Sequence, residues 1–205
     1  HVRSRRQRQM CIRDSSSRSS YAGIGILKST DKGKTWQHMG LSDSHHIGRI
    51  MVNPDNANEV TVGVTGHLYS PNKERGIYKT TDGGKTWKKT LFIDDNTGII
   101  DVAVSPNNYQ MQYAAAWQKD RKAWNFSGSG EGSGIYKSTD AGTTWTKIST
   151  PSSGFPTGEG VGRIGLAVFD DNILYAVHDN QFRREKSKEK TVSYTHLRAH
   201  ETRHD

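Results

Sequence analysis

The positions of hydrophobic and polar residues along this chain predict β-strands and no helix. Apolar side chains alternate with polar or small ones over short runs, which is the period of a strand with two different faces. Each run stops at residues that favour turns, such as glycine, proline, asparagine or aspartate. The clearest runs are 48–52, 98–104 and 162–168, and each is followed by a compact turn and a second β-rich run. We therefore expect antiparallel strand pairs joined by tight turns.

The same order of elements then repeats. A strand of the type Gly-Ile-Tyr-Lys follows at 76–79 and again at 134–137, and leads into an eight-residue box with the pattern S/T-T-D-x-G-x-T-W. The box occurs three times, and we expect its aspartate and glycine to form a turn that its buried tryptophan anchors. These residues are Asp31, Gly33, Trp36, Asp82, Gly84, Trp87, Asp140, Gly142 and Trp145. Because the constellation recurs in every repeat, we interpret it as structural and not as a catalytic site.

Four short antiparallel strands per repeat are typical of a β-propeller blade, and the spacing of the boxes suits blades with loop insertions. We predict an all-β fold, a partial β-propeller of four-stranded antiparallel blades. It should hold the end of one blade, two whole blades and half of another. We expect such a piece to fold poorly alone, because its outermost blade faces are bare without the remaining blades of the same parent chain as partners.

The box resembles the Asp-box, or bacterial neuraminidase repeat, and the runs 134–140 and 162–168 resemble the sortilin-type N-terminal propeller proteins of bacteria. The likeness covers about residues 21–180. It implies a secreted or periplasmic protein whose relatives include sialidases, xyloglucan-degrading enzymes and peptide-binding sortilin receptors. The first hypothesis is therefore a glycan- or peptide-binding module. The alternative is a glycoside hydrolase, xyloglucanase-like or sialidase-like, although the Phe/Tyr-Arg-Ile-Pro motif expected of sialidases is absent from the sequence.

The positive net charge of the chain is concentrated at its two ends. The 205 residues carry a formal net charge of +8, but residues 1–15 hold five arginines against one aspartate, and residues 183–190 hold five cations against two glutamates. The central part is close to neutral, so bulk charge does not indicate a nucleic-acid partner. No apolar run approaches the roughly 20 residues of a membrane span, so no membrane segment is expected.

We interpret the two ends as translated sequencing-library adapters, which are not expected to form part of the fold. Residues 9–15 back-translate to CAG ATG TGT ATA AGA GAC AG, whose reverse complement in another frame encodes Val-Ser-Tyr-Thr-His-Leu, the sequence of 192–197. The alternative is a genuine basic arm and a His-rich tail. The expected organisation is 1–15 adapter-derived and disordered, 16–182 propeller, 183–191 charged tail, and 192–205 adapter-derived and disordered. The single cysteine, Cys11, lies in the first segment, so neither a disulfide nor a thiol nucleophile is expected.

A propeller blade sorts its connections onto two faces. If the strands of a blade are called A to D from the axis outwards, the A–B turns and the boxes lie on one face, here called the first face. The B–C and D–A connections lie on the other, the second face. The second face receives the long and uneven connections, which are 42–47, 66–75, 94–98, 118–133, 151–161 and the segment after His178. Function is expected there, because binding residues concentrate on loops held by a rigid scaffold.

The candidate ligand-binding residues are on or near that face. They are Arg49, His67, Glu74, Arg75, Trp124 and Arg163. The arginines at the starts of two inner strands could form a cationic site for a carboxylate or sulfate, or could pair with acidic residues between blades. Trp124, together with Trp117, could form a sugar-stacking platform or a wedge that packs the long loop. The histidines lack metal-type spacing, so no metal or cofactor is expected.

Glycoside hydrolysis would need two carboxyl groups about 5 to 10 Å apart. The second-face candidates are Glu74, Asp94, Asp95, Asp120, Glu131, Glu159 and Asp179, and the sequence pairs none of them. The glycine-rich segment 128–132 leads into a strand and lacks the lysine of a phosphate-binding loop. We interpret it as a flexible excursion.

Overall fold

The computed structural model describes residues 21–122 and 124–182. Over these residues the chain forms β-strands and two short 3-10 turns, η1 (Ser42–Ser44) and η2 (Pro151–Ser153), without an α-helix. The segments 1–15 and 192–205, interpreted above as adapter translations, and the tail 183–191 lie outside the described residues.

Two complete blades occupy the middle of the chain. Each is a four-stranded antiparallel sheet whose strands follow one another, as a meander predicts. Blade 2 consists of β3 (Ile47–Val52), β4 (Val60–Val64), β5 (Gly76–Thr80) and β6 (Lys88–Leu91). Blade 3 consists of β7 (Thr97–Ser105), β8 (Asn108–Gln118), β11 (Gly134–Ser138) and β12 (Thr146–Lys147).

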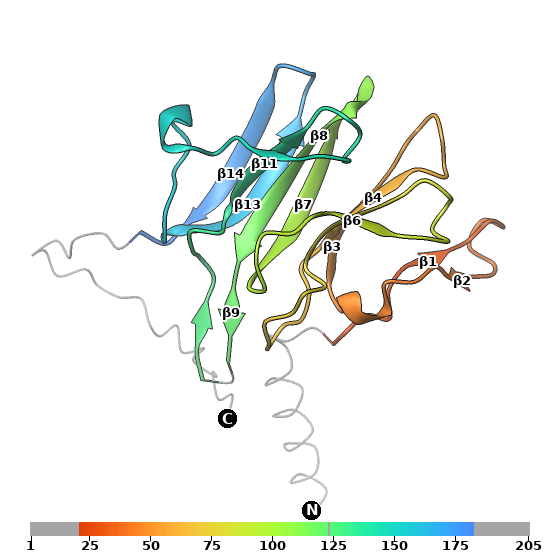
Figure 1. Ribbon diagram of the computed structural model, residues 1–205, viewed down its shortest axis with the longest axis horizontal. Coiled ribbons are helices and arrows are strands. Elements are labelled where there is room, and N and C mark those ends of the chain that lie inside the picture. Colours follow the sequence, from red (N-terminus) through yellow and green to blue (C-terminus); the bar gives the residue numbers. More distant parts are fainter. Residues whose placement is uncertain (1–20, 123, 183–205) are drawn as a thin grey trace, which may run out of the picture.

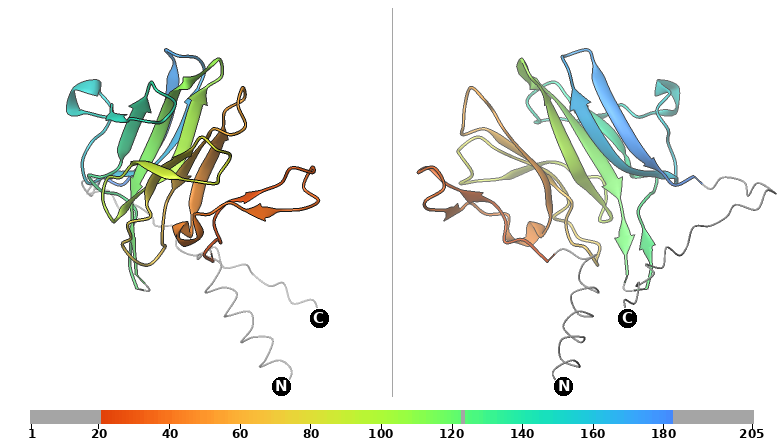
Figure 2. Two further views of the ribbon diagram at one scale, coloured as in Figure 1. Left: turned by 45° about the vertical axis from the view of Figure 1, so that its right-hand side comes forward. Right: turned by 180° about the vertical axis from the view of Figure 1, so that it is seen from behind.

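Half-blades flank these two sheets. Blade 1 is the outer pair β1 (Leu27–Lys28) and β2 (Gln37–His38), and blade 4 is the inner pair β13 (Val161–Val168) and β14 (Leu174–Asn180). The blades stand side by side in chain order (Figures 1 and 2). The predicted fold class is confirmed: the chain holds the end of one blade, two whole blades and half of another.

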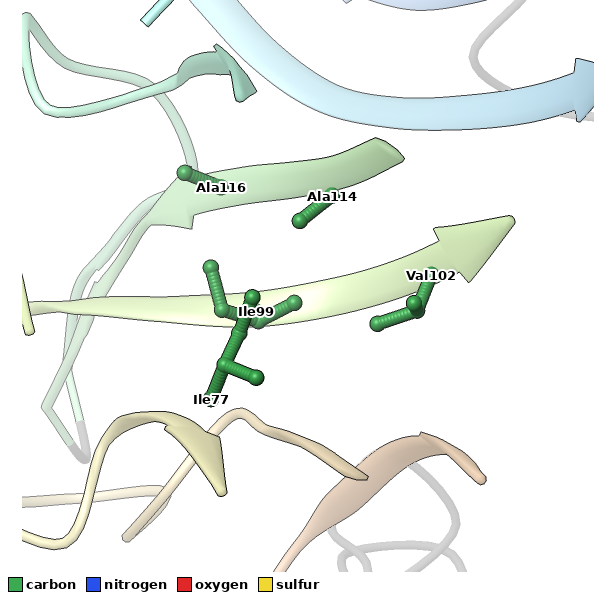
Figure 3. Close-up of a cluster of buried hydrophobic side chains, with 5 residues drawn as sticks. All are labelled: Ile77, Ile99, Val102, Ala114 and Ala116. Carbon is green, nitrogen blue, oxygen red and sulfur yellow. The ribbon is translucent and has the colours of Figure 1, made fainter. Parts of the chain in front are cut away.

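The core lies between neighbouring blades. Between blades 2 and 3, Ile77 and Ile99 are completely buried and pack with Val102, Ala114 and Ala116 (Figure 3). Equivalent clusters lie between blades 3 and 4, and between blades 1 and 2. Successive residues of a strand point to opposite faces of its sheet, so each whole blade contributes apolar side chains to the blade before it and the blade after it.

Every inner strand is bulged near its start. The pairing register shifts between Ile47 and Arg49 in β3, between Ile99 and Asp101 in β7, and between Val161 and Ile164 in β13. Arg49, Asp101 and Gly165 follow the bulges in their strands. Each of them pairs with a residue at the same position in strand B, the second strand of its blade. Arg49 and Asp101 are therefore equivalent positions, whereas Arg163 lies two residues earlier, inside the bulge. A bulge re-aims the side chains next to it, which sequence similarity alone does not reveal.

The long connection 118–133 contains the glycine-rich segment 128–132 that we interpreted above as a flexible excursion. It forms a hairpin from β9 (Asp120–Arg121) and β10 (Phe126–Ser127), which projects from the second face (Figure 1). Its glycine-rich end is tied down, because the Gly130 amide donates to Val161 O at 3.2 Å and the Gly132 amide to Gln118 Oε1 at 2.8 Å. A Cβ on Gly130 would lie 2.3 Å from the same Gln118 oxygen, so a glycine at this position permits the close approach of the two segments.

Candidate functional site

The three boxes form one turn geometry. In the second box, Asp82 Oδ1 accepts hydrogen bonds from the Thr86 amide at 2.9 Å and the Thr80 hydroxyl at 2.7 Å, and Oδ2 accepts one from the Thr86 hydroxyl at 2.7 Å. Asp31 and Asp140 are held in the same way. Hydrogen bonds to the charged form lower a carboxyl pKa, and the bond from the threonine hydroxyl four residues on contributes most to lowering the pKa of Asp31 to about 2. Each carboxylate is engaged by its own turn.

The glycine of each box has a left-handed backbone, as the sequence predicts. The φ angle is 86° at Gly33, 98° at Gly84 and 80° at Gly142. A side chain is disfavoured in that region, so the glycine is a requirement of the turn.

The box tryptophans pack against the preceding blade. Trp87 Nε1 donates to Met39 O of blade 1 at 2.6 Å, and Trp145 Nε1 donates to Thr90 Oγ1 of blade 2 at 3.2 Å. Both rings are half-buried. Trp36 is 60% exposed, so the prediction of a buried ring is wrong for this box. Trp36 belongs to blade 1, and among the described residues no blade precedes blade 1 for its ring to pack against.

We expect Asp82→Ala to lower Tm by several degrees, because three hydrogen bonds of the turn lose their acceptor. The pKa of Asp82 is lowered from 3.8, mainly by the Thr86 hydroxyl. The stabilisation is therefore present above the unfolded value and lost as pH falls through the folded one. Thermal unfolding followed by circular dichroism should show the difference from wild type shrinking as pH falls below about 4. Asp55→Ala, in an exposed turn, is the control; lost ligand binding at unchanged stability would contradict a structural role.

The connections of successive blades meet on the second face. The backbone amide of Asn72 in blade 2 donates to Asp95 O at 2.9 Å, and the backbone amide of Lys119 in blade 3 donates to Asn96 O at 3.2 Å. Gly130 is joined to Val161 of blade 4 in the same way. These backbone bonds make one continuous surface from loops that are far apart in sequence.

Three of the predicted ligand residues gather around one buried asparagine in the loop 66–75. Asn72 Oδ1 accepts from the His67 amide and from Arg75 Nε, both at 3.0 Å, while Asn72 Nδ2 donates to Glu74 Oε2 at 2.8 Å. That last bond is the main cause of the lowered pKa of Glu74. The structure thus brings His67, Glu74 and Arg75 together.

Arg75 supports this loop from within. Its side chain is 1% exposed, and its guanidinium donates to the carbonyl oxygens of His67, Ser70 and Asn96 at 3.0 to 3.2 Å. Burial lowers its pKa, against the effect of nearby carboxylates. A guanidinium that is buried and held by four acceptors supports the loop from within, and it is not exposed for contact with a ligand.

Arg49 forms the inter-blade ion pair that was the alternative to a cationic site. Its Nε lies 3.2 Å from Asp101 Oδ1, with the Arg49 side chain still 56% exposed. Asp101 Oδ2 also accepts from the Leu166 amide at 3.1 Å, so one carboxylate joins the inner strands of blades 2, 3 and 4. Arg163 is exposed on β13 and is not part of this network.

The two tryptophans of the long loop have different roles. Trp117 packs against Phe126 edge to face, with ring centroids 6.3 Å apart, and Trp117 Nε1 donates to Gly128 O at 2.6 Å. It is the wedge that holds the hairpin to blade 3. Trp124, at the hairpin turn, is 83% exposed, so its ring is available for stacking.

Two adjoining hollows lie at the base of this hairpin and share Gln118, Ser127 and Ser129. The first has a volume of about 380 Å³, and the residues that complete it are Tyr69, Pro71, Asn96, Lys119, Asp120 and Lys122. The second has a volume of about 590 Å³, and the residues that complete it are Asp94, Gly130, Glu131, Gly132 and Glu159. Most of these side chains are hydrogen-bonding groups.

Three of the seven carboxyl candidates therefore share a hollow, which the sequence could not establish. Asp94 is engaged locally, because its Oδ1 accepts from the Asn96 amide and its Oδ2 from the Thr97 hydroxyl, each at 2.7 Å. Glu131 and Glu159 are exposed. They come from the ends of different connections, 118–133 and 151–161, which only the fold brings together.

Sequence reasoning missed Gln118 and Lys119. Both lie at the end of β8, where the strand runs out onto the second face. Lys119 is buried, and burial first, with repulsion from Arg75 and Arg121, lowers its pKa to about 8. The sequence signal that could have indicated a buried Lys119 is its position directly after the long, largely apolar strand β8.

The second-face histidines form a ring stack. The His45 and His67 rings are 3.7 Å apart between centroids and nearly parallel, and His67 Nε2 lies 3.1 Å from Asp43 O. Burial and the neighbouring histidines lower the pKa of His45. Within residues 21–122 and 124–182, no group of three or more potential metal ligands is assembled. No helix in that part of the chain has the length and apolar character that a membrane crossing needs.

Meander sheets set side by side, with a box at each outer hairpin, define the class of this protein as a β-propeller, here partial. The family model Sortilin-Vps10, described as sortilin, neurotensin receptor 3, matches residues 25–205. The chain belongs to this family.

The similar proteins found among curated sequences and solved structures share little sequence identity with this chain. A xyloglucanase from Paenibacillus sp is 27% identical over 174 residues, covering 76% of this chain and 16% of the relative. The GH74 enzyme of Niastella koreensis is 16% identical, with a TM-score of 0.45 over 77% of this chain and 24% of that one. An ancestral GH74 enzyme is 19% identical, with a TM-score of 0.39 over 78% and 25%. The chain thus spans about a sixth of the curated relative and a quarter of these structures.

Proposed function

We propose that this chain is part of a secreted or periplasmic sortilin-family propeller that binds a glycan on its second face. The observation that carries the proposal is the pair of adjoining polar hollows, the first of which is lined by the exposed ring of Tyr69, on the face from which the hairpin with Trp124 projects. Sugar recognition combines hydrogen bonds to hydroxyl groups with stacking of the apolar sugar face on an aromatic ring, and the amphipathic rings of this surface suit the second role.

The lining chemistry supports a hydroxyl-rich ligand. Gln118, Ser127 and Ser129 lie between the two hollows and offer both donors and acceptors. Tyr69, an exposed ring, lines the first hollow, and a second exposed ring, Trp124, lies at the turn of the projecting hairpin. A xyloglucanase among the relatives is consistent with a polysaccharide, and the extracellular location follows the same relatives.

A glycoside hydrolase is the second candidate, favoured by one observation: Asp94, Glu131 and Glu159 line a single hollow. Hydrolysis needs one carboxyl group as acid and another as base or nucleophile. Because Asp94 is engaged in its own turn, Glu131 and Glu159 are the pair to test.

Trp124→Ala should weaken binding of xyloglucan oligosaccharides at least about tenfold, because the variant loses a stacking surface, while Tm is unchanged. Isothermal titration calorimetry of the parent protein, with its remaining blades, measures the affinity. Trp36→Ala is the matched control, an exposed tryptophan on the opposite face, and should bind like wild type. Equal weakening by both changes would contradict a second-face site, and binding of peptides but not glycans would contradict the ligand class.

Release of reducing sugar from xyloglucan separates the two candidates. We expect none, with binding retained by Glu131→Gln and Glu159→Gln. Release by wild type that both variants abolish would establish the hydrolase instead.

A further inference from the structure

Lys119 is a buried cation at the wall of the first hollow. The residue follows β8 directly, is 6% exposed and lines that hollow. Its Nζ lies over the ring of Trp117, 5.4 Å from the ring centroid. Among the residues that the structure describes, this Nζ forms neither a hydrogen bond nor an ion pair. The charge therefore has no counter-ion in this part of the chain.

Arg75 shows how the same region satisfies a buried cation that supports the fold. Four acceptors hold its guanidinium. One of them, Asn96 O, also accepts from the backbone amide of Lys119 at 3.2 Å, so the two cations belong to one backbone junction. Burial of an ammonium group without such acceptors costs free energy, and an apolar side chain would fill the same space without that cost. The positive charge of Lys119 thus brings no visible benefit to the fold.

The charges around Lys119 do not replace a counter-ion. Burial first, and then repulsion from Arg75 and Arg121, lowers the pKa of Lys119 to about 8, so the ammonium group is still the main form at neutral pH. Asp120 is the next residue in sequence, but its Oδ2 lies 3.4 Å from Lys122 Nζ. This carboxylate is paired with a lysine of its own hairpin.

The two adjoining hollows differ in charge. Lys119 and Lys122 line the first hollow against one carboxylate, that of Asp120, which leaves one net positive charge. The charged side chains that line the second hollow are all carboxyl groups, those of Asp94, Glu131 and Glu159. An anionic group is therefore attracted to the first hollow and repelled by the second.

The walls of the first hollow come from the two whole blades. Tyr69 and Pro71 belong to the connection 66–75 of blade 2, Asn96 precedes the inner strand of blade 3, and the other lining residues belong to the connection after β8. Its volume of about 380 Å³ falls in the range of small-molecule sites. The hollow thus offers an aromatic ring, hydroxyl and amide groups, and one ammonium group to the same ligand.

We propose that the first hollow receives an acidic sugar unit, one that carries a carboxylate or a sulfate group, and that Lys119 binds this anion. The inference rests on the glycan-binding function proposed above and names the chemical class of the ligand. A charge-assisted hydrogen bond from the ammonium group to the anion supplies the partner that Lys119 lacks within the described residues. Because the second hollow disfavours another anion, the ligand is a glycan whose acidic units are flanked by neutral ones.

Titration calorimetry of the parent protein, with its remaining blades, tests the ligand class. The probes are a xylo-oligosaccharide with a glucuronate side unit, the same oligosaccharide with that carboxyl group reduced to the alcohol, and the reduced form sulfated at the same carbon. At least one acidic form should bind about tenfold or more tightly than the neutral one, and the two acidic forms distinguish a carboxylate from a sulfate. Equal affinities for all three overturn this inference and leave glycan binding intact. Binding of none of them overturns both.

Lys119→Met tests the residue. This variant should bind acidic and neutral forms equally, while Tm stays the same or rises, because an apolar side chain replaces a buried charge without a counter-ion. Lys73→Met removes an exposed lysine of the connection 66–75 that lines neither hollow, and should keep the preference for the acidic form. A preference retained in Lys119→Met, or lost in both variants, overturns the proposal. A fall in Tm of several degrees would assign Lys119 to the fold instead, and the three oligosaccharides on wild type would still decide the ligand class.

Discussion

Replacing Arg75 by methionine is expected to lower the free energy of unfolding by about 3 kcal/mol, because three partly buried carbonyl groups lose their donor at once. The guanidinium is inside the loop 66–75 and joins it to Asn96 of the next blade. Methionine keeps much of the apolar volume of the side chain but donates no hydrogen bond. Urea unfolding followed by fluorescence measures the change.

The same variant should also bind glycan less tightly although Arg75 touches no ligand in this proposal, because Tyr69 and Asn96 line the first hollow and lose their support. Arg75→Lys should recover little, since an ammonium cannot reproduce the planar fork. Arg163→Met, at an exposed position, is the control and should change stability by less than about 0.5 kcal/mol. Unchanged stability in Arg75→Met would contradict the supporting role.

Ile99→Ala is expected to cost about 2 to 5 kcal/mol, the range for truncating a fully buried aliphatic side chain. Ile99 is completely buried at the contact of blades 2 and 3 and packs with Ile77 (Figure 3). Truncation of this side chain leaves a cavity between the two sheets. The hydrogen bonds within each sheet keep the strands in place, so the sheets collapse only partly into the cavity. The chain should then unfold at markedly lower urea concentration, with the same slope on denaturant.

Ile24→Ala is the matched control for this change. Ile24 is 64% exposed, so the same truncation should change stability by less than about 0.5 kcal/mol. Similar losses at both positions would mean that the blade contact is not a packed core.

The face that carries the two hollows could be predicted from the sequence, but the arrangement of the side chains that line them could not. The uneven lengths of the connections predicted which face carries the hollows. His67 and Glu74 were candidates, yet their common partner Asn72 was not, because an asparagine in a loop is typical of a turn. Arg75 was a candidate ligand-binding residue, since nothing in its local sequence shows that three carbonyl groups converge on its guanidinium.

The sequence by itself determined the blades, the order of their strands and the turn geometry of the boxes. These depend on alternation and on hydrogen bonds within five consecutive residues, as between Thr80 and Gly84, so they are local. Only the tertiary structure decided that Arg49 pairs with Asp101, that Trp36 is exposed and that Glu131 and Glu159 share a hollow. Each of these depends on a bulge or on a neighbouring blade, and the contacts between blades join residues that no short stretch of sequence relates.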